Sequence, residues 1–309
     1  MMSRRVWSCL LLVALVPLTA SAQTNPLWQE SKIKNYLPHM SWPEVQDLLT
    51  RTDMVIIPVG SIEEHGPQLP EGTDFLNGLE RALLIAQKTD VLVAPILLPG
   101  NSPYHMEFPG TITLPAELIQ EVYVEASRSL IRHGFRRFLL LNSHGGNQTI
   151  TRFIVDRLNQ ETEAIAVDLG DAAAPFQKRA PRPRSPVFDR HAGVGETSDA
   201  LYLLPSLVNL SAARATTLTL PDHLQKMLPE VVAGDPTAQM VFLAEALKAK
   251  ETGKHTSTRE MTPTGVWSLR DPKEATVDQG RESVEAFTAA AVAFIERWKA
   301  LRPLEPAGQ

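Results

Sequence analysis

Cysteine and excess positive charge are both scarce in this sequence, and each scarcity removes a class of protein. Cysteine occurs once, at Cys9, which excludes a disulfide scaffold and a cysteine-based zinc site. Lys+Arg is 30 against Asp+Glu 35, for a formal net charge of −5, so no positive excess is present to bind a phosphate backbone. We therefore expect no nucleic-acid partner, and any metal must be bound by histidines and carboxylates.

Long apolar runs are also scarce, with one exception near the start. Two arginines precede the apolar run Val6–Leu18, and an Ala-Ser-Ala sequence with the form of a cleavage site follows at residues 20–22. This pattern predicts a cleaved secretory signal peptide over residues 1–22. An uncleaved membrane anchor is the alternative, although the run is short for a bilayer. We expect a periplasmic or secreted protein in which residues 23–309 form one domain without membrane attachment.

The rest of the chain has ordinary globular composition, with 43% hydrophobic and 21% charged residues. Apolar runs closed by turn residues predict strands, and segments with helical spacing lie between and after them. The predicted strands are Met54–Val59, Val91–Pro95, Phe138–Asn142 and Ala164–Leu169, and the predicted helices are Phe75–Lys88, Ala116–His133, Gln148–Asn159, Thr237–Lys250 and Lys273–Leu301. This alternation predicts an α/β domain with a largely parallel sheet. The Pro- and Arg-rich segment Ala172–Arg190 is predicted to be a long surface loop that covers a pocket.

The segment after the first predicted strand carries two carboxylates and a histidine. Glu63 and His65 are two residues apart, so their side chains point to the same side of an extended chain. Asp74 follows beyond a Gly/Pro turn, at the expected start of a helix. These groups at the carboxyl end of a strand suit a divalent metal site. A helix cap at Asp74 and a polar turn residue at His65 are the alternatives.

Two other Gly-rich segments carry histidines near strand ends. The segment Asn142–Asn147 follows the third predicted strand and brings His144 to the same edge of the sheet. His144 is either a metal ligand or a turn histidine bonded within its own loop. The loop Asn101–Thr111, which contains His105, is suited to line a pocket.

A fourth segment, His191–Ser198, opens a predicted helix. Glu196 in this segment is a candidate ligand or base, and His191 is a candidate proton carrier, because imidazole titrates near neutral pH. A helix cap and a surface histidine are the alternatives. Four of the 8 histidines thus lie in Gly-rich segments, a clustering that random scatter rarely produces.

These motifs, in this order, resemble the creatininase (creatinine amidohydrolase) family. Its pattern G-S-x-E-x-H-G-P-x-L-P-x-x-x-D is matched by Gly60, Ser61, Glu63, His65, Gly66, Pro67, Leu69, Pro70 and Asp74. The segments Phe108–Thr111, Asn142–Asn147, His191–Ser198 and Pro263–Trp267 follow in the family's order. The likeness extends from Trp42 to Leu301.

The resemblance implies a three-layer α/β/α fold and hydrolysis of a non-peptide C–N bond, often in a cyclic amide or formamide. It also implies two divalent metal ions per subunit, zinc or manganese with iron also accepted, and a homo-oligomer that is often a hexamer. Carried over by position, the implied ligands are Glu63, His65, Asp74 and His144, with Asp74 bridging the two ions.

Two positions depart from the creatinine-hydrolysing members. Those members have a glutamate ligand two residues after the histidine of the second motif, where this chain has Gly146. Because the second ion would otherwise have too few protein ligands, we expect Glu196 to complete its set. Those members also have a tryptophan where this chain has Val187, and no tryptophan lies between Trp42 and Trp267. Creatinine itself is therefore not the expected substrate.

The expected function is hydrolysis of a small-molecule amide by a hydroxide that bridges two metal ions. His191 is expected to protonate the leaving nitrogen, and Glu196 to act as ligand or base. Glu64 is a candidate to assist this proton transfer, and a solvated neighbour of the ligands is the favoured alternative. The alternatives are a metal-dependent hydrolase that trims a peptide, and a non-catalytic periplasmic protein that binds a metal or a small ligand.

Overall fold

The computed structural model describes residues 30–177, 188–220, 222–246 and 258–304. The described residues from Ile33 onward belong to one compact unit. The predicted signal peptide at 1–22 lies outside the described residues, so its cleavage and the single domain over 23–309 stay predictions. Within the described ranges, no helix has both the length and the apolar character needed to cross a membrane.

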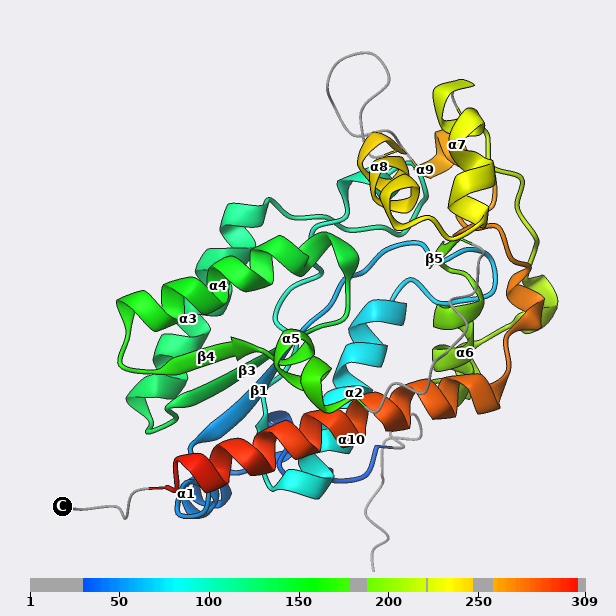
Figure 1. The fold of residues 1–309 in the computed structure, drawn as a ribbon. Helices are drawn as coiled ribbons and strands as arrows, with labels where there is room; N and C mark the ends of the chain where they lie inside the picture. The colour runs from blue at the N-terminus through cyan, green and yellow to red at the C-terminus, as the bar shows by residue number, and fades with distance from the viewer. Residues whose placement is uncertain (1–29, 178–187, 221, 247–257, 305–309) are drawn as a thin grey trace, which may run out of the picture. The chain divides into compact units, whose positions relative to one another are not determined.

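A four-stranded parallel sheet lies at the centre of this unit (Figure 1). Its strands are β1 (Met54–Val59), β2 (Leu92–Val93), β3 (Arg137–Asn142) and β4 (Ile165–Asp168), in the spatial order β2-β1-β3-β4. Every residue of β1 is buried, because helices cover both faces of the sheet, and this explains its continuous apolar run. Val59 pairs with Asn142, so the chain leaves β1 and β3 at the same edge.

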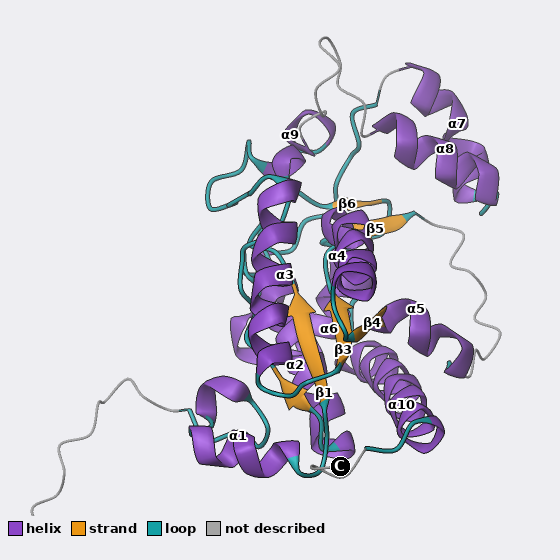
Figure 2. Cartoon of the chain, turned by 90° about the vertical axis from the view of Figure 1, so that its left-hand side faces the viewer, coloured by secondary structure: helices purple, strands orange, loops and turns teal. Residues whose placement is uncertain are grey.

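Helices form a layer on each face of the sheet (Figure 2). One layer contains α1 (Trp42–Leu49), α3 (Ala116–Arg132) and α4 (Gln148–Glu161), and the other contains α2 (Thr73–Thr89), α5 (Leu169–Ala173) and α10 (Val277–Leu301). Val55 and Ile57 face the first layer, whereas Met54 and Ile56 face the second, as alternation along a strand requires. The predicted three-layer α/β/α fold is confirmed.

The remaining elements extend beyond the carboxyl edge of the sheet. They are β5 (Asp189–His191) and β6 (Trp267–Ser268), which pair antiparallel, and the helices α6 (Val194–Leu203), α7 (Asp222–Val232), α8 (Pro236–Ala246) and α9 (Thr258–Met261). A separate apolar cluster, which includes Phe188, Phe242 and Trp267, packs α7, α8 and α9 against the β5–β6 pair. The antiparallel pair was not predicted, because strands of two or three residues carry too little periodicity to recognise.

The strands predicted from the sequence are confirmed with small shifts at their ends. The predicted loop Ala172–Arg190 is wrong at both of its ends, where the structure has helical turns and a strand. Its first residues are helical in α5 and in a 3₁₀ turn at Ala174–Phe176, and β5 starts at Asp189. The helix starts because the Asp168 side chain accepts a hydrogen bond from the backbone N–H of Asp171 at 3.1 Å. Residues 178–187 of this loop lie outside the described residues.

The predicted C-terminal helix Lys273–Leu301 is present, but its first residue is Val277. A 3₁₀ turn at Pro272–Glu274 precedes α10, which starts at Val277. Thr276 is the N-cap, because its side chain accepts a hydrogen bond from the Gln279 N–H at 3.2 Å. For the predicted helix Thr237–Lys250, α8 is described only as far as Ala246.

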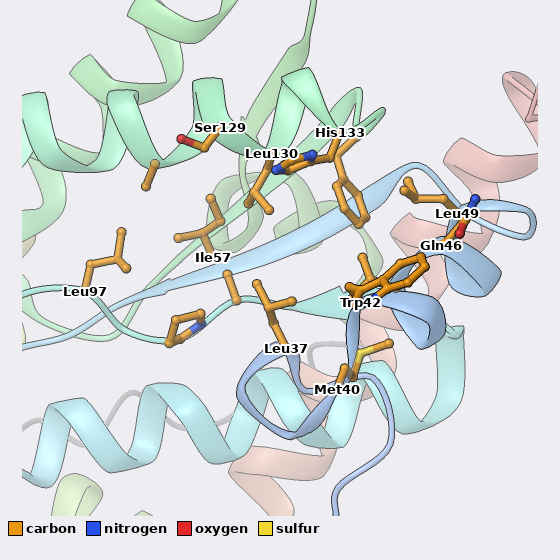
Figure 3. Close-up of a pocket in the computed structure, with 15 residues that line it drawn as sticks. Leu37, Met40, Trp42, Gln46, Leu49, Ile57, Leu97, Ser129, Leu130 and His133 are labelled. Atoms are coloured by element: carbon orange, nitrogen blue, oxygen red, sulfur yellow. The ribbon is translucent and has the colours of Figure 1, made fainter.

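An apolar groove of about 890 Å³ lies between α1 and α3 (Figure 3). Leu37, Trp42 and Leu130 are among the residues that line it, and the metal-ligand candidates are not. The groove is therefore separate from the predicted chemistry.

The connections after β1 and β3 place the predicted site. The two strands are neighbours, but α2 follows β1 on one face and α4 follows β3 on the other. Such a divergence leaves a crevice outside the carboxyl ends of the strands, which is where open parallel sheets bind ligands. The candidate ligands come from the segments that leave this edge.

Candidate metal centre

The loop after β1 and the first turn of α2 bring three candidate ligands into one buried cluster. Glu63, His65 and Asp74 are all buried. The N-cap of α2 is Gly72, and the carboxylate of Asp74 instead accepts a hydrogen bond from the Ser61 hydroxyl at 2.8 Å. The alternative interpretation of Asp74 as a helix cap is therefore wrong.

Asp74 shares its two carboxylate oxygens between two histidines. Its Oδ2 lies 3.0 Å from His144 Nδ1, and its Oδ1 lies 3.4 Å from His65 Nε2. Glu63 Oε1 lies 3.2 Å from the same His144 nitrogen, and Glu196 Oε2 lies 3.7 Å from the same His65 nitrogen. Among the described residues, four groups of three possible ligands have their ligand atoms within 4.8 Å of one another. Asp74 belongs to two of these groups, the sets Glu63/Asp74/His144 and His65/Asp74/Glu196.

Backbone carbonyls fix the orientation of both imidazoles. His144 Nε2 lies 2.9 Å from the Asn101 carbonyl oxygen, and His65 Nδ1 lies 3.1 Å from the carbonyl oxygen of Glu63. A carbonyl only accepts hydrogen bonds, so these nitrogens carry the protons of the neutral rings. In the neutral form, the other nitrogen of each ring faces the cluster with a lone pair, which is the arrangement of metal-binding histidines.

The charges in the cluster shift the proton affinity of both histidines. Burial alone lowers the pKa of His144, but the carboxylates of Glu63 and Asp74 outweigh burial and raise this pKa to about 10. Burial also lowers the pKa of His65, but the carboxylates of Asp74 and Glu196 outweigh burial and raise this pKa. Both imidazoles are therefore protonated on both nitrogens and positively charged in the metal-free protein. Metal binding releases the additional proton from such a site.

Buried polar atoms without partners show that the cluster fits divalent cations. Glu63 Oε2 and His65 Nε2 are buried and have no hydrogen-bond partner among the described residues. Such atoms are costly in a folded protein unless a cation or another partner compensates them. Carboxylate oxygens and imidazole nitrogens are suitable ligands for zinc and manganese. The donor set therefore fits two ions that share Asp74.

Glu196, on the first turn of α6, is the carboxylate of the cluster most open to solvent. Its side chain is 35% exposed, against 7% for Asp74. Its Oε2 accepts a hydrogen bond from the Ala192 N–H at 2.6 Å, which fixes the carboxylate. A cavity of about 270 Å³ borders Glu196 and Asp74, with Asn77 and Arg81 among its other lining residues. Solvent and small molecules can reach the cluster from this side.

The surroundings of Gly146 leave no room for a side chain at this position. A Cβ atom at Gly146 would overlap the Asn101 carbonyl, the ring of His144 and the Tyr104 hydroxyl. A side chain at 146 would therefore displace the carbonyl that orients His144. The structure brings Glu196 to the second set, as expected from the sequence, although ion binding by Glu196 stays a prediction.

His191 and Glu64 are buried, although the sequence left a surface position open for each of them. His191 is buried, so the surface-histidine alternative is wrong, and its Nδ1 lies 3.7 Å from Glu63 Oε1. Glu64 is also buried, so the expectation of a solvated neighbour is wrong. Burial raises the pKa of Glu64, but the nearby imidazoles of His105 and His191 outweigh burial and lower it to about 2.

Sequence reasoning did not predict the contacts of several residues that complete the cluster. Ser61 and Asn101 hold ligands through hydrogen bonds, and Glu64 joins His105 to His191. The presence of His105 in a Gly-rich loop was a signal of a pocket. The pairing of Glu64 with two distant histidines gave no signal, because it depends on tertiary contacts.

Comparison with known proteins identifies relatives along most of the chain. A family model for creatininase, described as creatinine amidohydrolase, matches residues 38–295. The 3-dehydro-scyllo-inosose hydrolase of Thermotoga maritima is 28% identical over 82% of this chain and 85% of its own length. The mycofactocin precursor peptide peptidase of Mycobacterium ulcerans is 30% identical over 79% of this chain and 85% of its own length.

The fold is shared with solved structures. A crystal structure of creatinine amidohydrolase superposes with a TM-score of 0.65 at 21% identity, over 88% of this chain and 99% of the other. A Zn–Zn form and a manganese form of creatininase share the fold at TM-scores of 0.63 and 0.61.

Proposed function

This chain belongs to the creatininase family of metal-dependent amidohydrolases, and we propose that it hydrolyses a non-peptide C–N bond of a small molecule with two divalent ions per subunit. The observation that carries the proposal is the position of Asp74, whose two oxygens face His144 and His65 separately. A carboxylate shared in this way suits a bridging ligand between two cations.

The proposed roles follow from the two ligand sets. Glu63, Asp74 and His144 would hold one ion, and His65, Asp74 and Glu196 the other. Two such ions, when bound, lower the pKa of water and polarise a carbonyl oxygen. The carbonyls of Asn101 and Glu63 keep His144 and His65 oriented toward them.

His191 is proposed to deliver a proton to the leaving nitrogen. Its Nε2 lies 2.7 Å from the Glu64 carbonyl oxygen, so in the neutral ring Nδ1 is the nitrogen left to accept and return a proton at the cluster. The backbone N–H groups of Gly145 and Gly146, which follow His144, are the proposed donors to the oxyanion of the tetrahedral intermediate.

Peptide trimming is the second candidate reaction. It is supported by the peptidase from Mycobacterium ulcerans, which is 30% identical to this chain. Both reactions would use the same cluster, so a substrate comparison is needed to separate them. Product analysis after incubation of the zinc- or manganese-loaded protein with lactams, formamides, linear amides and short peptides would do so. Release of peptide fragments alone would favour the second candidate.

Substitution of His144 tests the metal-dependent reaction. We expect His144→Ala to lose bound ion and hydrolytic activity together, because the set with Glu63 and Asp74 would keep no nitrogen ligand, while the circular dichroism spectrum stays native. His133→Ala, which removes an exposed histidine, should keep both. Full turnover in a His144→Ala protein that contains no metal would reject the proposal.

Export and assembly are also proposed. The pattern at residues 1–22 supports export to the periplasm or medium, and the mass of the exported protein should then correspond to a chain that begins at Gln23. The resemblance to creatininase supports a homo-oligomer, which light scattering coupled to size-exclusion chromatography would measure. A full-length, membrane-bound product would contradict the cleaved signal.

A further inference from the structure

Glu64 lies between two ligand candidates in the sequence, Glu63 and His65, but belongs to neither proposed ligand set. Glu64 Oε1 lies 2.9 Å from His105 Nδ1 and 3.4 Å from His191 Nε2. One buried carboxylate thus contacts two histidines from different parts of the chain.

The surroundings of Glu64 are built to hold this carboxylate. Its Oε2 accepts a hydrogen bond from the Gly66 N–H at 3.0 Å. Gly265 has φ +80° and lies so close that a Cβ atom there would overlap the carboxylate. The Thr258 hydroxyl, on α9, lies 2.9 Å from His105 Nδ1. The segment after α9, which includes the Pro263–Trp267 motif, therefore closes over Glu64 and excludes water from it.

These contacts determine which nitrogens face the metal centre. Glu64 and Thr258 surround His105 Nδ1, and His105 Nε2 lies 3.6 Å from Glu63 Oε1. The Glu64 carbonyl accepts from His191 Nε2 at 2.7 Å, and His191 Nδ1 lies 3.7 Å from the same Glu63 oxygen. The two rings stack with centroids 4.2 Å apart. Both rings therefore present one nitrogen to a single ligand oxygen of the cluster.

We propose that Glu64 is a positioning residue that holds His105 through its buried carboxylate and His191 through its backbone carbonyl, so that each ring directs one defined nitrogen at the metal centre. The proposal rests on the proposed function, in which His191 carries the proton for the leaving nitrogen. His105 stacks on His191 and restricts the rotation of its ring. A carboxylate that orients an imidazole in this way also fixes its tautomer.

Glu64→Gln is the test, because glutamine keeps the size of the side chain and removes the charge and one acceptor. In the zinc-loaded protein we expect ion content to stay at the wild-type value, because Glu64 belongs to neither proposed ligand set. We expect kcat on the best substrate of the amide panel to fall about 10- to 100-fold, the usual cost of removing an orienting partner, with KM within about 2-fold of wild type. Glu71→Gln is the matched control and should keep kcat, because Glu71 is a nearby carboxylate with no ion pair to a histidine among the described residues.

The imidazole ¹⁵N NMR spectrum supplies a readout that needs no substrate. In zinc-loaded wild type, His105 should be protonated at Nδ1 alone and His191 at Nε2 alone, and Glu64→Gln should give mixed tautomers for at least one of them. Glu64→Asp, which keeps the charge but shortens the side chain, covers the case in which Glu64→Gln does not fold, and it should also disturb one ring. Unchanged tautomers in the folded variant would overturn the proposal.

The two readouts also separate this proposal from the proposed function. If wild type hydrolyses nothing in the panel but the tautomers shift as expected, the positioning role stands and the reaction class is wrong. If wild type is active and Glu64→Gln keeps full kcat, the positioning role is overturned and the reaction class stands.

Discussion

Asp74 combines burial with two separate contacts, and no other carboxylate of the cluster belongs to both ligand sets. Its hydrogen bond from Ser61 adds a third restraint on the same side chain. Rigid ligands of this kind keep metal–ligand distances constant through a reaction cycle. At the scale of single residues, the chemistry thus depends on a few side chains whose rotamers are locked by their neighbours.

Gly146 offers a residue-level prediction. We expect Gly146→Ala to weaken ion binding by about 10- to 100-fold, because the added methyl would overlap the Asn101 carbonyl that orients His144. Titration of the metal-free variant with zinc against a competing chelator measures the change. Gly145→Ala is the matched control, because a Cβ atom at Gly145 meets nothing within 4 Å. Equal zinc affinity in the two variants would contradict this account of Gly146.

At the scale of elements, the contact between α6 and α10 holds the second ligand set together. A Cβ atom at Gly280 of α10 would overlap the backbone carbonyl of Ser198 in α6, so the two helices pack at backbone distance. Glu196 lies two residues before Ser198 on the same helix. Any shift of α6 away from α10 would move Glu196 relative to His65.

We expect Gly280→Ala to destabilise the protein by about 1–3 kcal/mol, the usual cost of overpacking, and to weaken the binding of one ion more than the other. Urea unfolding and the zinc titration measure the two effects. Arg281→Ala, which removes an exposed ion pair with Asp278, should change stability by less than about 0.5 kcal/mol. If Gly280→Ala were as stable as Arg281→Ala, the close packing of α6 on α10 would not be required.

The helices and strands also differ in how far they could be predicted from the sequence. The strands and α2, α3, α4 and α10 were predicted because long apolar periodicity and caps are local signals. The β5–β6 pair and α7 were missed because short strands and a helix with an internal proline at Pro229 give weak local signals. The motifs predicted the cluster because the carboxyl ends of parallel strands meet at one edge. The place of Glu64 depended on contacts with His105 and His191 that only the folded chain reveals.

At the scale of the whole molecule, metal removal should make stability sensitive to alkaline pH. The pKa of His144 is raised to about 10 in the metal-free protein, against about 6.5 in an unfolded chain. The stabilisation from its protonated form is therefore fully present below about pH 6.5 and is lost as pH rises through about 10.

We expect the melting temperature of the chelator-treated protein to fall between pH 7 and pH 10, measured by circular dichroism. The zinc-loaded protein should melt at a higher temperature, because an ion that binds only the folded state stabilises it, and should change less over this range, because the ions replace the protons. Parallel pH profiles for the two forms would show that the cluster does not bind the ions.

The ligand candidates are supplied by the loop after β1, by α2, by the loop after β3 and by α6. Glu196 is the candidate that comes from beyond the sheet, and α6, which carries it, packs on α10. An ion bound by His65, Asp74 and Glu196 would therefore cross-link α6 to the first turn of α2 and to the loop after β1.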